Sequence, residues 1–359
     1  MPKFHSSHHH PPSLLDSTTP IVDTPKPPVI VVGLPRSGSS FLSHVLSFLD
    51  DWYVFDDLYP YQKALAVGAN PFLTPSQLTE FVSQLCWAAR AKIKWEKNFR
   101  IPKCTLEDVD RLETAVCNTF VDRTVTWPQV LEEWMMRLAL LHGCNRWGYK
   151  TPQDFMHLDT LAEIFPDARF VFIMRDPRQM MASMKNLKKH VGGDGNPHQY
   201  HPVAYSLYWK TAFNQVRSFI KTGKALVHVV PFEDLIESPD QFAQSLAEFL
   251  NTTVSQSIET KGANSSFPSG SRQRLTPSEC WLCERLAGDS MLAAGYKLSG
   301  HSLQWQDCPD LARTTWLFIR YQFQRLIRNK RSRQSVMSYL KTLKTELFKS
   351  KAALSPPLE

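Results

Sequence analysis

Residues 33–40 combine a flexible backbone with groups that bind anions. They read Gly-Leu-Pro-Arg-Ser-Gly-Ser-Ser, after the four apolar β-formers 29–32 and before an apolar helical pattern that begins at Phe41. In such a strand–turn–helix unit, the backbone N–H groups of Ser37 to Ser40 point at one spot that the helix dipole makes attractive to negative charge. With the guanidinium of Arg36 beside them, they predict a phosphate or sulfate ligand.

This turn differs from that of nucleotide triphosphatases at one position. Those enzymes place Lys-Ser or Lys-Thr after the second glycine. Here Gly38 is followed by Ser39 and Ser40. Ser39 stands where those enzymes have the lysine, so the lysine is absent and both positions carry hydroxyls. A kinase and a plain strand–helix turn without ligand therefore stay open as alternatives.

A second anion-binding pattern follows another buried strand, 169–174. The strand leads into Arg175-Asp-Pro-Arg, in which Asp176 suits a helix cap and Pro177 suits the first helical turn. Arg175 at the strand end and Ser183 two turns along the helix can close on one phosphate.

Together these two patterns resemble the donor-binding signatures of the sulfotransferases that use 3′-phosphoadenosine 5′-phosphosulfate (PAPS). In that family the first turn holds the 5′-phosphosulfate, and an Arg…Ser pair at the same separation holds the 3′-phosphate. The resemblance implies binding of PAPS as co-substrate, without a metal, by residues of both patterns. These are Arg36, Ser37, Gly38, Ser39, Ser40, Arg175 and Ser183.

Other landmarks extend the resemblance over residues 29–298. Lys150-Thr-Pro152 is similar to a Lys-x-Pro element, which implies that Lys150 reaches the sulfate or its bridging oxygen and acts in catalysis with Arg36. Phe232 stands where the family has a tyrosine, so a hydroxyl contact to the nucleotide is lost there. The layout is nearest to the tyrosylprotein and carbohydrate sulfotransferases, but it does not identify the acceptor.

A general base is expected in the segment Val54-Phe-Asp-Asp-Leu58. Tyrosylprotein sulfotransferases have Gly-Glu-Glu at the same distance from the first motif, and their second carboxylate is the base. The resemblance assigns this role to Asp57, with Asp56 and His44 as alternatives. Asp57 is one methylene shorter than glutamate, so the acceptor must sit closer or the loop must differ.

The elements that position these residues predict a P-loop NTPase-like three-layer α/β/α sandwich with a central parallel sheet. Strands are expected at 29–33, 146–149, 169–174 and 226–230. A capping box at 74–77 and a helical pattern over 127–141 indicate a helical insertion. The expected organisation is a disordered leader (1–28), a sulfotransferase domain (29–298) with the insertion at about 60–145, and a basic amphipathic helical tail (299–359).

Charge is concentrated in the tail. Residues 311–351 contain eleven Lys or Arg and one acid, Glu346, whereas the whole chain of 359 residues carries a net charge of +7. The apolar residues of this stretch are expected to pack on the domain while the arginines face water; they are Trp316, Leu317, Ile319, Tyr321, Phe323, Leu326 and Ile327. The alternative to a solvated helix is that this tail binds an anionic membrane or anionic acceptors. Nucleic acid is not expected as a partner, because no binding module accompanies the charge.

The composition agrees with an enzyme of the cytoplasm. Hydrophobic residues make up 43% of the chain, no apolar run is long enough for a membrane span, and the N-terminus lacks the apolar core of a signal peptide. The expected reaction is transfer of a sulfuryl group to a hydroxyl of a small molecule, glycan or peptide, an amine being less favoured. The alternatives are a small-molecule kinase and a non-catalytic nucleotide-binding protein.

Overall fold

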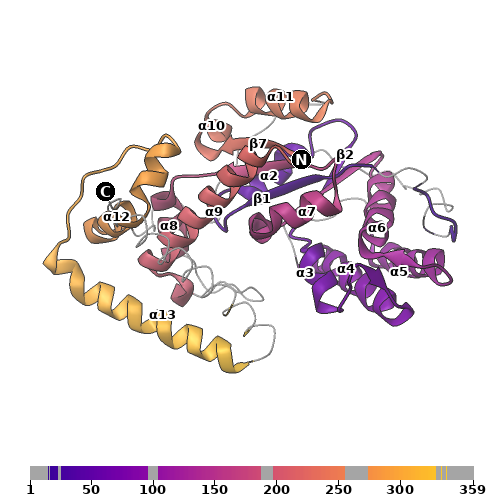
Figure 1. The fold of residues 1–359 in the computed structure, drawn as a ribbon, viewed down its shortest axis with the longest axis horizontal. Coiled ribbons are helices and arrows are strands. Elements are labelled where there is room, and N and C mark those ends of the chain that lie inside the picture. The colour runs from indigo at the N-terminus through magenta and orange to yellow at the C-terminus, as the bar shows by residue number, and fades with distance from the viewer. Residues whose placement is uncertain are drawn as a thin grey trace, which may run out of the picture.

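A five-stranded parallel sheet forms the centre of the molecule (Figure 1). The structure is a computed structural model that describes residues 15, 17–22, 26–95, 104–186, 197–254, 274–328, 333 and 337. The strand order is β2-β5-β1-β6-β7. The strands are β1 (Val29–Gly33), β2 (Trp52–Asp56), β5 (Arg146–Lys150), β6 (Arg169–Met174) and β7 (Leu226–Pro231). All four predicted strands are therefore confirmed, and β2 is added at one edge.

Both faces of the sheet are covered by helices. Val29 and Val31 of β1 pack into one apolar cluster, with α2 (Ser39–Leu46), α10 (Phe232–Glu237) and α11 (Pro239–Leu250). Alternate residues of a strand point to opposite faces. Accordingly, Ile30 and Val32 belong to a second, larger cluster. Its helices include α6 (Trp127–Leu141), α7 (Leu158–Ile164) and α9 (Pro202–Thr222). The predicted three-layer α/β/α sandwich is confirmed.

The region between β2 and β5 is largely helical. It contains α3 (Pro60–Ala66), α4 (Pro75–Trp95), α5 (Leu106–Phe120), α6 and a short antiparallel pair, β3 (Phe72–Leu73) with β4 (Val125–Thr126). The predicted capping box begins α4, because the Thr74 N–H donates to Gln77 Oε1 at 2.9 Å and the Gln77 N–H to Thr74 Oγ1 at 3.4 Å. These helices cover one end of the sheet.

Part of the predicted leader lies against α6. The Ile21 N–H donates to Glu133 Oε1 at 3.1 Å, and the Lys26 N–H donates to Glu132. Residues 17–22 and 26–28 thus contact the domain, and Leu15 is buried. The other residues of the leader lie outside the described part of the chain.

The remaining elements come after β5 in the chain. They are the 3₁₀ turns Pro152–His157, Pro197–Gln199 and Trp305–Asp307 and the helices α8 (Pro177–Lys185), α12 (Pro277–Ala293) and α13 (Cys308–Arg328). In Figure 1, α13 runs along the lower edge of the molecule. None of the described helices is both long and apolar enough to span a membrane.

The expected packing of the basic tail helix is wrong for four of its apolar residues, whereas Leu317, Tyr321 and Leu326 are half-buried. Trp316, Ile319, Phe323 and Ile327 of α13 are all more than half exposed, although they were expected to pack on the domain. The helix contacts the domain with its other side, which carries half-buried residues such as Tyr321. Apolar and basic side chains therefore share the outer face.

Candidate active site

The turn between β1 and α2 has the backbone expected of an anion-binding loop. Arg36 and Gly38 have φ of 73° and 98°, both in the left-handed region. The Ser37 N–H donates to Leu34 O at 3.0 Å, so it closes the turn and does not join the row of amides expected to face a ligand. The first helical bond runs from the Leu42 N–H to Gly38 O.

The N-terminus of α2 therefore offers the amides of residues 39–41, which precede that first helical bond. Next to them, the buried hydroxyl of Ser37 has no hydrogen-bond partner among the described residues. A buried polar group without a partner is costly unless a ligand or water completes it. Both features fit a bound oxyanion.

The structure brings the two predicted anion-binding patterns together. Arg36 Nε donates to Ser183 Oγ at 3.0 Å, and Arg175 Nη1 donates to Arg36 O at 3.2 Å. These residues lie 147 and 139 positions apart in the chain. Burial lowers the pKa of Arg36, and a guanidinium with so high an ordinary pKa still stays charged. An anion at this turn would meet two arginines and a serine.

Phe232 holds this group together from α10. The Arg175 guanidinium carbon lies 4.1 Å from the centre of the Phe232 ring. A Cβ added to Gly38 would come within 2.3 Å of the same ring. The ring of Phe232, which replaces the family's tyrosine, thus lies against both the turn at Gly38 and the guanidinium of Arg175.

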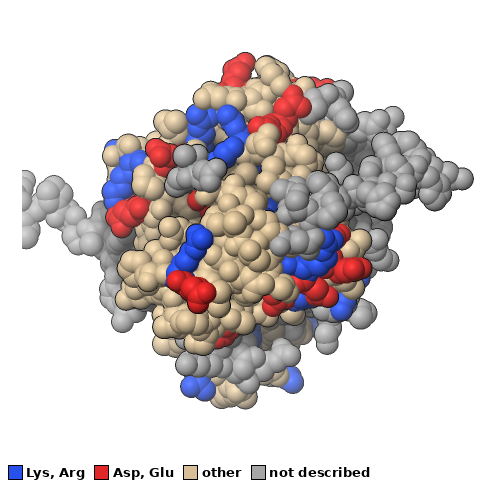
Figure 2. Space-filling model, turned by 90° about the vertical axis from the view of Figure 1, so that its right-hand side faces the viewer, with Lys and Arg blue, Asp and Glu red and all other residues tan. Residues whose placement is uncertain are grey.

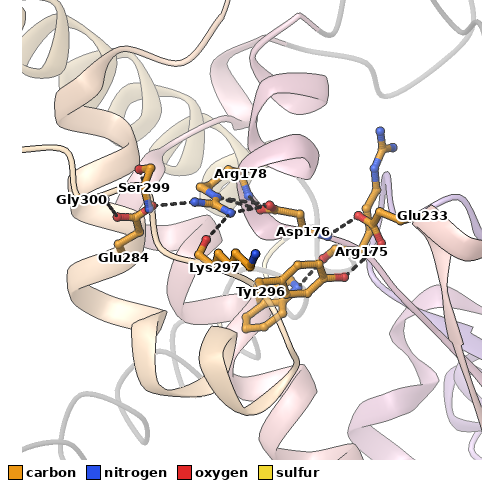
Figure 3. Close-up of polar contacts among 10 residues, drawn as sticks. Arg175, Asp176, Arg178, Glu233, Glu284, Tyr296, Lys297, Ser299 and Gly300 are labelled. Carbon is orange, nitrogen blue, oxygen red and sulfur yellow. Dashed lines mark hydrogen bonds and ion pairs between the residues drawn. The ribbon is translucent and has the colours of Figure 1, made fainter.

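A polar network fixes the backbone around Arg175. Trp209 Nε1 donates to Arg175 O at 3.0 Å, and the Asp176 N–H donates to Glu233 Oε1 at 3.0 Å. Tyr296 Oη donates to the other oxygen of Glu233. In Figure 3 the guanidinium of Arg175 points away from these contacts. The network therefore holds the main chain and leaves the guanidinium directed toward the turn.

Arg178 ties α8 to the segment that follows α12. It binds both carboxylate oxygens of Asp176, Glu284 Oε1 at 2.7 Å and Lys297 O at 2.9 Å (Figure 3). Glu284 in turn accepts from the N–H and hydroxyl of Ser299. Sequence reasoning did not assign this role to Arg178.

A buried ion network lies at the carboxyl ends of β2 and β5. Lys150 Nζ lies 2.5 Å from Asp57 Oδ1 and 2.9 Å from Asp56 Oδ1, and it donates to Ser40 Oγ at 3.2 Å. Lys92 Nζ of α4 binds the other oxygen of Asp56 at 3.1 Å. Strand β2 pairs with β5 in parallel, with Asp56 opposite Lys150. The sheet register thus brings the predicted catalytic residues to the turn.

The network keeps opposite charges balanced. Burial favours the neutral form of Asp56, but Lys150 and Lys92 outweigh it and lower the pKa of that carboxyl. Burial likewise disfavours the charged form of Lys150, but Asp57 and Asp56 outweigh it and raise its pKa. Lys150 is therefore a fixed cation beside the anion-binding turn.

The candidate bases differ in their surroundings. The Asp57 side chain is 40% exposed, whereas that of Asp56 is 9% exposed and bound by two lysines. Asp57 has a left-handed φ of 59°, which turns the chain at the end of β2. His44 lies near the C-terminal end of α2, where its ring contacts Phe48 at 5.0 Å. Of the two carboxylates, Asp57 is therefore the more accessible to solvent.

Lys92 was missed because it lies outside the motifs. It continues the buried face of α4 formed by Phe81, Leu85 and Ala89, although it is charged. A lysine on the apolar stripe of a helix is rarely buried without a partner. That position in the helical pattern is the signal that identifies it.

A second buried carboxyl lies close by. Asp154 is fully buried, and its Oδ1 accepts from Gln62 Nε2 at 2.7 Å. Its Oδ2 has no hydrogen-bond partner in the part of the chain that the structure describes. Burial raises the pKa of Asp154 to about 7, against a small opposing effect of Gln62. The carboxyl is thus poised between its two protonation states near neutral pH.

Comparison with known proteins identifies the family of the chain. The model of the sulfotransferase family matches residues 27–256. A Caenorhabditis briggsae protein described as a "putative protein-tyrosine sulfotransferase" is 22% identical over 236 residues, which cover 64% of this chain and 67% of that protein.

Two bacterial sulfotransferase structures were also matched. The one from Alicyclobacillus acidocaldarius is 15% identical, with a TM-score of 0.41 over 82% of this chain and 96% of the other. STF9 from Mycobacterium avium is 15% identical, with a TM-score of 0.38 over 81% of each chain.

Proposed function

Because this chain belongs to the sulfotransferase family, we propose that it transfers the sulfuryl group of PAPS to a hydroxyl acceptor and releases 3′-phosphoadenosine 5′-phosphate (PAP). The observation that carries the proposal is the contact of Arg36 with both Ser183 and Arg175. It unites the two sequence patterns that the family uses for opposite ends of the donor.

The residues present fit such a donor. The amides at the start of α2, with Arg36, Ser39 and Ser40, would hold the 5′-phosphosulfate, and the unpartnered Ser37 hydroxyl supports an oxyanion there. Arg175 and Ser183 would hold the 3′-phosphate. PAPS supplies the activated sulfuryl group and a phosphate leaving group.

For this reaction the protein must position donor and acceptor, stabilise the negative charge on the sulfuryl and leaving oxygens, and accept one proton. The acceptor oxygen forms a bond to sulfur while the bond from sulfur to the bridging phosphate oxygen breaks. Asp57 takes the proton of the acceptor hydroxyl, and Lys150 and Arg36 stabilise charge on the sulfuryl and leaving oxygens. Lys150 is already oriented by Asp56 and Asp57.

For the acceptor we propose a hydroxyl of a peptide or protein as the first class to test. The support is the name of the Caenorhabditis briggsae relative, which is described as acting on protein tyrosine. A phenolic oxygen is also a good nucleophile once a carboxylate removes its proton. A cytoplasmic location remains a prediction.

Ligand-dependent unfolding temperatures test the donor. We expect PAP to raise the unfolding temperature of the full-length protein, and Mg-ATP to have no effect. Arg175→Ala should abolish the shift, whereas Arg217→Ala on the exposed side of α9 should retain it. Stabilisation by Mg-ATP alone would point instead to a kinase.

Mass spectrometry tests the reaction itself. Tyrosine-containing peptides incubated with enzyme and PAPS should gain one SO₃ group. PAP binding without transfer to peptides, phenols, sugars or lipid alcohols would contradict the proposed activity and favour a nucleotide-binding protein.

A further inference from the structure

The outer face of α13 is an apolar stripe without cover from the described residues. Trp316, Ile319, Phe323 and Ile327 are 58%, 61%, 63% and 66% exposed. Their spacing of three or four residues places them along one side of the helix. Single exposed apolar residues are common on proteins, but a continuous row of four marks an interaction surface.

Contacts on the opposite side of α13 fix the orientation of this stripe. Gln199 Nε2 donates to Tyr321 Oη at 2.9 Å, and His201 Nε2 lies 3.1 Å from Thr315 Oγ1. The ring of Phe318 lies 5.1 Å from that of His201. The helix is therefore attached to the domain through its inner face, and the stripe is presented outward.

Basic side chains border the stripe. Arg313 and Arg320 are exposed, and the guanidinium carbon of Arg320 lies 5.4 Å from the centre of the Trp316 ring. The sequence of α13 contains four arginines and one acidic residue, Asp310. Trp305, just before the helix, is 85% exposed. Aromatic residues beside arginines are typical of helices that lie in the headgroup region of a bilayer.

The insertion side of the molecule has a different surface. Figure 2 shows the side where α5 and α6 lie, with Lys and Arg close to Asp and Glu around a broad uncharged area. Ion pairs of Arg90 with Asp110 and Glu113 belong to this region. The basic excess of α13 is thus a local property and not one of the whole surface.

We propose that the outer face of α13 docks on an anionic lipid membrane. The arginines complement lipid phosphates and carboxylates, while Trp316 and its neighbours enter the headgroup boundary. A second copy of the chain would bring two positively charged helices together, and nucleic acid would leave the apolar stripe exposed. The proposal is independent of the reaction that the enzyme catalyses.

Vesicle flotation of the full-length protein tests the proposal. We expect binding to phosphatidylcholine vesicles that contain about one third phosphatidylserine, no binding to pure phosphatidylcholine, and weaker binding at high salt. The double variant Trp316→Ser/Phe323→Ser should bind at least about tenfold more weakly. The matched control is Trp87→Ser, because Trp87 of α4 is 59% exposed and should leave binding unchanged.

A second pair of variants tests the charge. Arg313→Gln/Arg320→Gln should weaken binding about 30-fold, since each cation near an anionic surface contributes about one factor of five. Arg217→Gln, an exposed arginine of α9, is the control. Circular dichroism and unfolding temperatures check that all variants fold.

Three outcomes would overturn the proposal. One is the absence of binding to anionic vesicles at low salt, and another is equal binding by the Trp316→Ser/Phe323→Ser and Trp87→Ser variants. The third is a dimer in sedimentation that the stripe substitutions convert to monomer, because it would assign the stripe to a second copy of the chain.

Discussion

Asp57 combines two properties that a base needs in this site, a charged partner and access to solvent. Its carboxylate touches Lys150 at 2.5 Å, yet the side chain is 40% exposed. Asp56 is held by both Lys150 and Lys92 and is nearly buried. We therefore propose that Asp57 removes the proton from an acceptor and that Asp56 positions Lys150.

Replacing Asp57 should separate catalysis from donor binding. We expect Asp57→Asn to lower kcat about 10²- to 10⁴-fold, because a general base is lost while the turn and both arginines stay in place. Initial rates of sulfuryl transfer measure the loss, and the unfolding-temperature shift with PAP should persist. Asp289→Asn, at an exposed position of α12, is the control. Full activity of Asp57→Asn would exclude this carboxylate as the base.

At the scale of elements, the turn between β1 and α2 depends on Gly38. Its φ of 98° disfavours any side chain, and an added Cβ would meet the Phe232 ring at 2.3 Å. Gly38→Ala should therefore displace Phe232 and the Arg175 guanidinium above it, and abolish PAP binding. Gly143 has a φ of 75° but no atom within 4 Å of its added Cβ.

Gly143→Ala is thus the matched control for the turn. Both substitutions carry the backbone cost of about 1–2 kcal/mol for a left-handed residue, but only the one at Gly38 adds a clash. Calorimetric titration with PAP measures the difference. Equal PAP affinity of the two variants would show that contact between Phe232 and the turn is not required.

The packing of α4 on β2 depends on a buried charge. Lys92→Met removes one of the two lysines that neutralise Asp56 and leaves a buried carboxylate with less compensation. Breaking such a pair costs about 3–5 kcal/mol in the free energy of unfolding. Lys94 lies two residues later on the exposed face of the same helix, so Lys94→Met should change stability by less than about 0.5 kcal/mol. Urea unfolding compares them, and equal values would contradict the structural role of Lys92.

These elements also show what the sequence could predict. The turn and the segment after β6 have local patterns, so their strands and the cap at Asp176 could be predicted from the sequence. The sequence paired Ser183 with Arg175, and the hydrogen bond from Arg36 to Ser183 was not predicted. The helical pattern of α4 places Lys92 on the buried face, but its partner Asp56 lies 36 positions away and is not identified by a local pattern.

The packing of α13 was predicted only in part for a related reason. An amphipathic pattern identifies the two faces of a helix but not which one meets the domain. Gln199 and His201 contact the side of α13 that carries Tyr321 and Thr315. The helical pattern alone does not predict which side these two residues contact. Tertiary contacts of this kind decide orientation.

For the whole molecule, one cluster of buried charge lies at the carboxyl ends of β2 and β5. Lys150 is the last residue of β5 and Asp56 is the last residue of β2, while Asp154 lies in the 3₁₀ turn after β5. Burying ionisable groups costs stability unless partners offset the loss of water. Lysines compensate Asp56, but among the described residues the carboxyl of Asp154 is hydrogen-bonded by the amide of Gln62 and by no cation. Overall stability should therefore depend on the protonation of Asp154.

The direction of that dependence follows from the pKa of Asp154, which burial raises to about 7. In the unfolded chain this carboxyl loses its proton near pH 4. Between these values the folded protein holds one proton more, so the group lowers the free energy of unfolding by roughly 1.4 kcal/mol per pH unit as pH rises, and the effect levels off above the folded pKa.

Asp154→Asn should remove this loss, because the amide resembles the protonated acid and cannot ionise. Its free energy of unfolding relative to wild type should increase between about pH 5 and pH 7 in urea titrations. Asp167→Asn, an exposed position before β6, should show no such trend. If both variants follow the wild-type pH profile, Asp154 is ionised in the folded protein, and its unpaired oxygen must be stabilised by a group bound there.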